Sequence, residues 1–167
     1  MKEKIFRNYL ELKSFKDFKE VKKPSEEFSV ELTNPKDFQL NKFFYKNIGK
    51  NCHWVDRLIW TDLDWIKYIS DEKLFTYILK DKYELAGYFE LLFNKEKKEA
   101  EILYFGILEE YFGKKLGGYL LSEAIKFSIN LGCARVWVHT CSLDHKNALF
   151  NYQSRGMRIF KSETLIR

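Results

Sequence analysis

The sequence predicts an α/β protein with a mixed, mostly antiparallel central sheet and helices on both faces. Three strand-like runs, at residues 74–79, 83–93 and 100–108, are separated only by short polar turns, which is the pattern of an antiparallel meander. A glycine-containing loop then leads into a helical pattern over residues 116–130, and a β-branched run follows at residues 135–140. Strand patterns that alternate with helical patterns indicate one layered α/β domain.

The N-terminal part is expected to contain two short strands, at residues 9–18 and 28–32. A helix should follow, with Asn34 as its N-cap and Pro35 at its first position, because both residue types favour those places. Gly49 should end this helix.

A second helical segment is expected over residues 54–60, and a third helix should begin at Thr61. Thr61 is a favourable N-cap, and the apolar spacing after it matches a helical period at Leu63, Ile66 and Ile69.

Towards the C-terminus, Gly132 should end the helix over residues 116–130. Asp144 should cap a helix over residues 145–154, which Gly156 ends, and residues 157–162 should form the last strand.

Composition narrows the class of protein. The chain has 167 residues, 46% of them hydrophobic, which suits one folded domain over residues 1–167. No run of eighteen apolar residues occurs and the charged N-terminus has no apolar signal core, so we expect a cytoplasmic protein without a membrane partner. The net charge of +5 comes from Lys and Glu that are interspersed, which favours a solvated surface over a nucleic-acid face.

The loop from Glu109 to Gly118 is the most informative segment. It joins a strand to a helix, and the first backbone N–H groups of a helix have no partner within the helix. Such a loop can bind an anion, so a ligand with phosphate groups is expected here.

These residues resemble the GCN5-related N-acetyltransferase (GNAT) family, which transfers an acyl group from coenzyme A to an amine. Placed between strand and helix, the family's Arg/Gln-x-x-Gly-x-Gly/Ala motif falls on Phe112, Gly113, Lys114, Lys115, Leu116, Gly117 and Gly118. Phe112 departs from the usual Arg or Gln, and Lys115 departs from the first Gly. A later family signature matches Asn147, Ala148, Tyr152, Gly156 and Met157.

The resemblance covers roughly residues 75–165 and implies the acyl-CoA N-acyltransferase fold. The co-substrate would be acetyl-CoA, and a helical region at residues 34–70 would lie on the acceptor side. Residues implied to bind CoA are Phe105, Ile107, Phe112, Gly113, Lys114, Lys115, Gly117, Gly118, Asn147 and Tyr152.

The resemblance also implies how acetyl-CoA would be held and how its thioester would react. The strand at residues 105–108 would pair with the pantetheine arm, and the Ile107 N–H would polarise the thioester carbonyl. Gly106 would allow the kink and the close approach of the ligand, although it could equally be a packing glycine. Tyr152 would donate a proton to the departing sulfur; otherwise it is an aromatic core residue.

Glu101 is the preferred general base, because the sequence around it resembles the strand that carries the catalytic Glu in the histone-acetylating branch of the family. Strict strand alternation would put Glu101, Leu103 and Phe105 on one face. Glu90 and His139 are the rival bases, and a solvated or structural role is the alternative for each.

The acceptor site is expected among early aromatic and charged residues: Trp54, Arg57, Trp60 and Glu90. Trp54 or Trp60 could form a cation–π wall, and Arg57 leaves room for a substrate carboxylate. Asp62 and Asp64 could attract a cationic amine. The alternative is a helical lid that packs its tryptophans onto the sheet.

His139, Cys141 and His145 have a spacing that invites a metal hypothesis. No second pair completes a tetrahedral set, so no metal is expected. The three cysteines form no CxxC pair, which argues against a disulfide framework.

The function expected is acetyl transfer from acetyl-CoA to the primary amine of a small molecule by direct attack. Two alternatives stay open: acetylation of a protein lysine or N-terminus, and an acyl-CoA-binding module without chemistry. A homodimer is possible.

Overall fold

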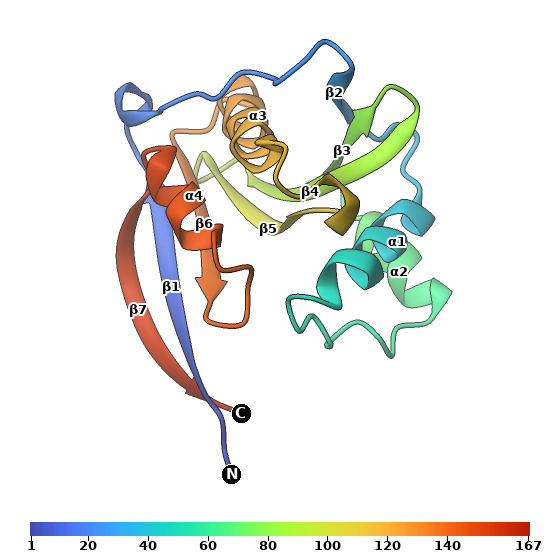
Figure 1. The fold of residues 1–167 in the computed structure, drawn as a ribbon, viewed down its shortest axis with the longest axis vertical. Coiled ribbons are helices and arrows are strands. Elements are labelled where there is room, and N and C mark those ends of the chain that lie inside the picture. Colours follow the sequence, from blue (N-terminus) through green and yellow to red (C-terminus); the bar gives the residue numbers. More distant parts are fainter.

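A computed structural model describes all residues 1–167, and it contains one seven-stranded sheet in the order β2-β3-β4-β5-β6-β1-β7 (Figure 1). The mixed sheet and the helices on both of its faces confirm the predicted class. The strands are β1 (Lys4–Leu12), β2 (Phe28–Leu32), β3 (Leu74–Asp81), β4 (Glu84–Asn94), β5 (Glu99–Ile107), β6 (Arg135–Cys141) and β7 (Arg158–Ile166). The α-helices are α1 (Phe38–Gly49), α2 (Asp62–Ile69), α3 (Leu116–Asn130) and α4 (Ala148–Ser154), with short 3-10 turns η1 (Phe15–Asp17) and η2 (Glu109–Tyr111).

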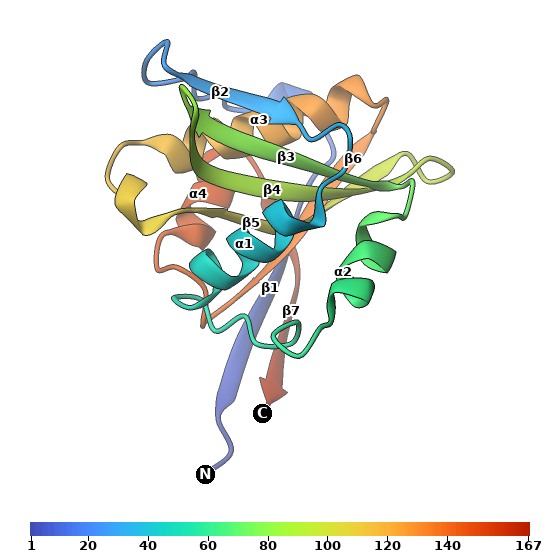
Figure 2. The same ribbon diagram turned by 90° about the vertical axis from the view of Figure 1, so that its right-hand side faces the viewer.

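The helices cover opposite faces of the sheet, as the two views show (Figures 1 and 2). On one face, Phe44 of α1 stacks on Tyr88 of β4 with ring centroids 4.8 Å apart. On the other, Phe127 of α3 stacks on Tyr77 of β3 at 4.3 Å. The consecutive β4 residues Tyr88 and Phe89 thus face different helices, and burial of both faces forms the core.

One strand pair is parallel, and it separates. β5 and β6 pair only from Glu99 opposite Arg135 to Ile102 opposite Val138, although both strands run further. Figure 1 shows the two strands diverging beyond this point. Every other neighbouring pair in the sheet is antiparallel.

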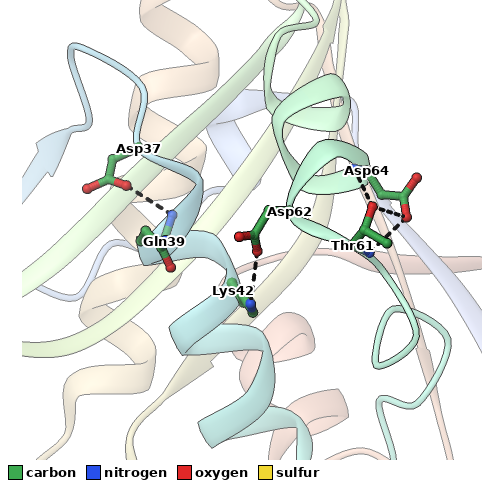
Figure 3. A network of polar contacts seen from close by, with 6 residues as sticks. All are labelled: Asp37, Gln39, Lys42, Thr61, Asp62 and Asp64. Atoms are coloured by element: carbon green, nitrogen blue, oxygen red, sulfur yellow. Dashed lines mark hydrogen bonds and ion pairs between the residues drawn. The ribbon is translucent and has the colours of Figure 1, made fainter.

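The first strand and the first helix differ from the sequence prediction. β1 covers Lys4–Leu12 rather than residues 9–18, and part of the expected strand is the turn η1. The helix begins at Phe38 with Asp37 as N-cap, whose carboxylate accepts a hydrogen bond from the Gln39 N–H at 2.9 Å (Figure 3). The Asn34–Pro35 signal lies three residues too early, because Asp37 satisfies the free N–H groups of the helix instead. The predicted end at Gly49 is confirmed.

Residues 54–60 form turns rather than the predicted helix. The Arg57 N–H donates to the Tyr45 hydroxyl of α1 at 3.0 Å, while the Leu58 and Trp60 N–H groups make only short-range bonds within turns. The next prediction is confirmed: Thr61 caps α2 in a capping box with Asp64 (Figure 3).

The C-terminal elements agree with the sequence except at α4 and at the last strand, because β7 covers Arg158–Ile166 rather than residues 157–162. The predicted helix over residues 116–130 is α3, and Gly132 follows it with a φ of 89°. Asp144 does not cap a helix over residues 145–154, because α4 begins at Ala148. Its carboxylate instead accepts from the Thr140 hydroxyl at 2.6 Å and the Cys141 N–H at 3.0 Å, which fixes the end of β6. None of the helices has the length and apolar character that crossing a bilayer requires.

Candidate active site

The separation of β5 from β6 opens a large cavity of about 1530 Å³. The inner end of β5, the loop after it, the end of β6 and α4 all line this cavity, together with residues 51–57. Because the strands part, one edge of β5 beyond Ile102 has no neighbouring strand. A ligand with peptide-like groups can pair with such an edge.

The loop between β5 and α3 has the geometry of an anion site. Gly113 has a φ of 78° and Lys115 a φ of 61°, both in the left-handed region. This conformation favours glycine, so it accounts for the glycine that the family motif has at the Lys115 position. The backbone turn persists here although the residue differs.

The other departure, Phe112, takes a different role. Its ring meets the His145 ring at 5.1 Å in an edge-on arrangement, so it packs against the loop before α4. Lys115, Gly117 and Gly118 line the cavity, whereas Lys114 lies over the Tyr111 ring.

A bulge in β5 changes the predicted orientation of Glu101. Leu91 pairs with Ile102 and Glu90 pairs with Tyr104, so Leu103 is an extra residue in the ladder. The bulge shifts the alternation, and Glu101 therefore does not share a face with Phe105, contrary to the strict alternation expected from sequence.

Glu101 lies one residue before the strands separate, opposite Trp137, and is not among the residues that line the cavity. Burial raises the pKa of its carboxyl group to about 7. A carboxyl group with this pKa can exchange a proton near neutral pH.

Glu90 is closed off from solvent in a polar cluster. Its carboxylate accepts from the Tyr68 hydroxyl at 2.6 Å and the Asn41 side-chain amide at 2.6 Å, and it pairs with Arg57 at 3.4 Å. Glu90 has an exposed fraction of 0% and does not line the cavity. Substrate therefore has no direct access to this carboxylate.

Arg57 does line the cavity, from within a cage of aromatic rings. Its guanidinium carbon lies 4.0 Å from the Tyr68 ring centroid, 4.2 Å from that of Tyr104 and 4.7 Å from that of Trp60. The Glu90 carboxylate counteracts the effect of burial, so the pKa of Arg57 is raised. The cation in this cage is thus the protein's own arginine.

Of the two tryptophans expected in the acceptor site, only one lines the cavity. Trp54 lines the cavity and meets the Tyr104 ring edge-on at 4.8 Å. Trp60 does not line it and packs against Trp65 at 4.9 Å.

Asp62 and Asp64 belong to the local structure of α2. Asp62 pairs with Lys42 of α1 at 3.1 Å, and Asp64 completes the Thr61 capping box (Figure 3).

Tyr152 and His139 both face the cavity. Tyr152 is buried at 6% exposure, its hydroxyl makes no hydrogen bond within the protein, and its ring lies 6.3 Å from the Phe105 ring. Burial raises the pKa of Tyr152 well above its usual range, so this group is a proton donor at neutral pH. Partial burial and the Arg7 guanidinium lower the pKa of His139.

Asn147 lines the cavity at the N-terminus of α4, where its N–H donates to His145 Nδ1 at 3.1 Å. Sequence reasoning missed two residues further along the chain, one within α4 and one just after it. Asn151 donates from its side chain to the Gly117 carbonyl at 3.0 Å, and Arg155 lines the cavity beside Gly118. A polar residue one turn after Asn147 was the available signal for Asn151.

No group of three or more His, Cys, Asp or Glu residues lies together in a way that could hold a metal ion. Burial raises the pKa of Cys141, and burial raises that of Cys52 to about 11. Both thiols are therefore protonated at neutral pH.

This geometry agrees with a comparison of the chain with known proteins. Residues 39–157 match the acetyltransferase (GNAT) family. The fold is similar to a GCN5-related N-acetyltransferase from Sphaerobacter thermophilus (TM-score 0.73, 13% identity, covering 97% of this chain and 50% of that one).

It is also similar to an aminoglycoside acetyltransferase from an uncultured soil metagenomic sample (TM-score 0.66, 14% identity, covering 80% and 90% of the two chains). An IAA acetyltransferase from Bacillus cereus has a TM-score of 0.57 and 21% identity, with 80% and 79% covered. No protein in a curated set matches the chain in sequence.

The chain spans about half the length of the Sphaerobacter protein. The family match covers most of the chain, and it agrees with the separated strands, the glycine-containing loop before α3 and the buried tyrosine. The chain belongs to the acetyltransferase (GNAT) family.

Proposed function

We propose that this protein is an acetyl-CoA-dependent N-acetyltransferase that acetylates the primary amine of a small molecule by direct attack. The observation that carries the proposal is the cavity between β5 and β6, which is lined by the loop before α3 and by Tyr152. Family membership supports the reaction type. The residues that line the cavity or lie beside it support a role for each step, as follows.

The phosphate groups of acetyl-CoA would bind at residues 112–118 and the first turn of α3. The backbone N–H groups there have no helical partner, and Lys115 lines the same region without forming an ion pair. The pantetheine arm would then extend along the free edge of β5.

The register of β5 supports the Ile107 N–H as the donor to the thioester oxygen. The Leu108 N–H donates to the Ala86 carbonyl at 2.8 Å, on the β4 side. In an antiparallel pair successive N–H groups alternate in direction, so those of Ile107 and Phe105 point towards the β6 side. An N–H group at this place can stabilise the charge that develops on the carbonyl oxygen.

The departing sulfur requires a proton, and Tyr152 is the donor that we propose. It is buried, protonated at neutral pH and free of competing hydrogen bonds. Asn147, at the start of the same helix, would bind the pantetheine amide.

The amine must lose a proton first, because an alkylammonium has a pKa of about 10 and carries no free lone pair. We propose that Glu101 accepts this proton through water, since its pKa near 7 suits the task and it lies beside the point where the strands separate. His139 is the alternative, because it lines the cavity directly. Glu90 is sealed and is not proposed as the base.

The acceptor would lie against Trp54, Tyr104 and Arg57, at the wall of the cavity. These residues line the cavity and present a mainly aromatic wall, against which a small molecule could pack. The cytoplasmic location and the homodimer expected from sequence stay predictions.

The test is release of free CoA from acetyl-CoA by the purified protein with a panel of small primary amines and lysine peptides. The proposal expects turnover with at least one small amine and slower turnover with peptides. Faster turnover with peptides would favour a protein acetyltransferase. Binding of acetyl-CoA without turnover on any acceptor would favour a binding module.

A further inference from the structure

Arg155, which follows α4, lies against the first turn of α3 and lines the cavity. A side chain at Gly118 would place its Cβ 2.4 Å from Arg155 Nη1, so the guanidinium occupies space that only glycine leaves free. One turn earlier, Asn151 donates to the Gly117 carbonyl at 3.0 Å. The end of α4 is therefore joined to the helix start that forms the anion site.

The Arg155 guanidinium has no counter-charge in the protein. It forms no ion pair, and its Nε is closed off from solvent without a hydrogen-bond partner. Arg57 and Arg135 differ, because Arg57 pairs with Glu90 and Arg135 pairs with Glu99. Arginines that are partly buried ordinarily pair with a carboxylate or a phosphate.

The segment at residues 17–21, which passes α4 and α3 (Figure 1), holds the backbone of Arg155 in place. The Lys19 N–H donates to the Arg155 carbonyl at 3.0 Å. Gly156, with a φ of 101°, brings the chain so close to Asp17 that an added Cβ would lie 2.0 Å from the Asp17 carbonyl oxygen. The segment is held in turn by the Val21 N–H, which donates to the Ser122 hydroxyl at 2.8 Å.

We propose that Arg155 binds a phosphate group of CoA and supplies the positive charge that Phe112 does not provide at the usual position of the motif. This inference rests on the proposed function. The shared chemistry is a phosphate oxygen bound by a guanidinium at the N-terminus of α3, and it has two possible sources: the diphosphate and the 3′-phosphate of the ribose.

The test is calorimetric titration of the full chain with CoA and with dephospho-CoA, for the wild type, Arg155→Gln and Arg158→Gln. Arg158 is the matched control, because it is three residues away, largely exposed and outside the cavity. Arg155→Gln should weaken CoA binding about tenfold or more, as expected for a charge-assisted hydrogen bond to phosphate, whereas Arg158→Gln should change it less than about twofold. Thermal unfolding confirms that each variant is folded.

The two ligands separate the sources. An equal loss with CoA and dephospho-CoA assigns Arg155 to the diphosphate, and a loss confined to CoA assigns it to the 3′-phosphate. Equal affinity of Arg155→Gln and the wild type, or equal losses in Arg155→Gln and Arg158→Gln, would overturn the inference. A wild type that binds neither ligand would instead overturn the proposed function.

Gly118→Ala offers a second variant that keeps the charge. The added methyl group must displace the guanidinium, so CoA affinity should fall, and adding Arg155→Gln should weaken it little further. Fully additive losses would show that Gly118 acts independently of Arg155 and would contradict the arrangement proposed.

Discussion

Charged side chains are paired on one side of the cavity and unpaired on the other. On the acceptor side, Arg57 is enclosed with Glu90, and the carboxylate also accepts from Tyr68 and Asn41. On the side of the α3 loop, Lys115, Lys146 and Arg155 line the cavity and none forms an ion pair. The first cluster is complete within the protein, whereas the second lacks an anion. We therefore propose that the first cluster supports the fold and that the second binds the anionic part of acetyl-CoA.

The largest effect should come from breaking the closed cluster. Arg57→Met leaves the Glu90 charge buried without its cation, and losses for such changes are about 3–5 kcal/mol. Urea denaturation should show this loss in the free energy of unfolding. Lys42→Met, which removes the cation of the exposed pair with Asp62, is the control and should cost about 1 kcal/mol or less.

The double variant Arg57→Met with Glu90→Leu sharpens this result. It removes both charges, so it should be more stable than Arg57→Met alone. A double variant that is less stable than the single one would show that Glu90 does not depend on Arg57.

The next largest effect should come from Tyr152, which lines the cavity near the α3 loop. Tyr152→Phe should lower kcat about 100-fold by removing the proton donor to the sulfur, with acetyl-CoA affinity unchanged within about twofold. Steady-state rates and a binding titration together measure this. Tyr119→Phe removes another buried phenol, on α3 and away from the cavity, and should leave kcat near that of the wild type. Equal rates for Tyr152→Phe and the wild type would remove Tyr152 as the acid.

The raised pKa of Glu101 predicts how the reaction rate depends on pH. Its carboxylate is the active form of a base, so the wild-type rate should rise as pH increases through about 7 and level off above it. Glu101→Gln should lower the rate and lose this rise. The pH profile of Glu99→Gln, two residues earlier on β5, is the control and should keep the rise. An unchanged profile in Glu101→Gln would assign the proton transfer elsewhere, with His139 next to be tested.

The same raised pKa affects stability. The folded state holds the Glu101 proton more tightly than the unfolded chain, so folding gains from it below the ordinary carboxyl range and loses this gain as pH rises through about 7. Glu101→Gln should therefore become more stable relative to the wild type between pH 5 and pH 8, as thermal unfolding at the two values would show. A constant difference would contradict the raised pKa.

The smallest effect is local to the acceptor side. Thr61→Ala removes the N-cap of α2 and should cost about 1 kcal/mol of stability. CoA affinity should stay the same, because the cap is outside the cavity. A change in CoA affinity in this variant would show that the two sides are coupled.

Sequence patterns predicted the regular elements well where the signal was local. The meander, the helix over residues 116–130 and the Thr61 cap follow from periodicity and capping chemistry, and the structure confirms each. The failures came from interactions that no local pattern contains. The helix expected over residues 54–60 is replaced by contacts with α1, and Asp144 bonds to the end of β6 instead of to a helix.

The candidate site shows the same limit. The loop and Tyr152 were predicted from the resemblance to the family, and both line the cavity. The orientation of Glu101 was wrong because one extra residue at Leu103 shifts the alternation, and a bulge leaves no clear mark in sequence. Arg155 was missed because its environment depends on Gly118 and on an N-terminal segment more than a hundred residues away.

Hydrogen exchange with and without saturating CoA would test the contrast between the two sides most directly. The account predicts slower exchange for backbone amides at residues 105–118 and around α4, with little change at residues 54–61 and along β4. Protection confined to residues 54–61, or absent from residues 105–118 in a protein that binds CoA, would contradict it.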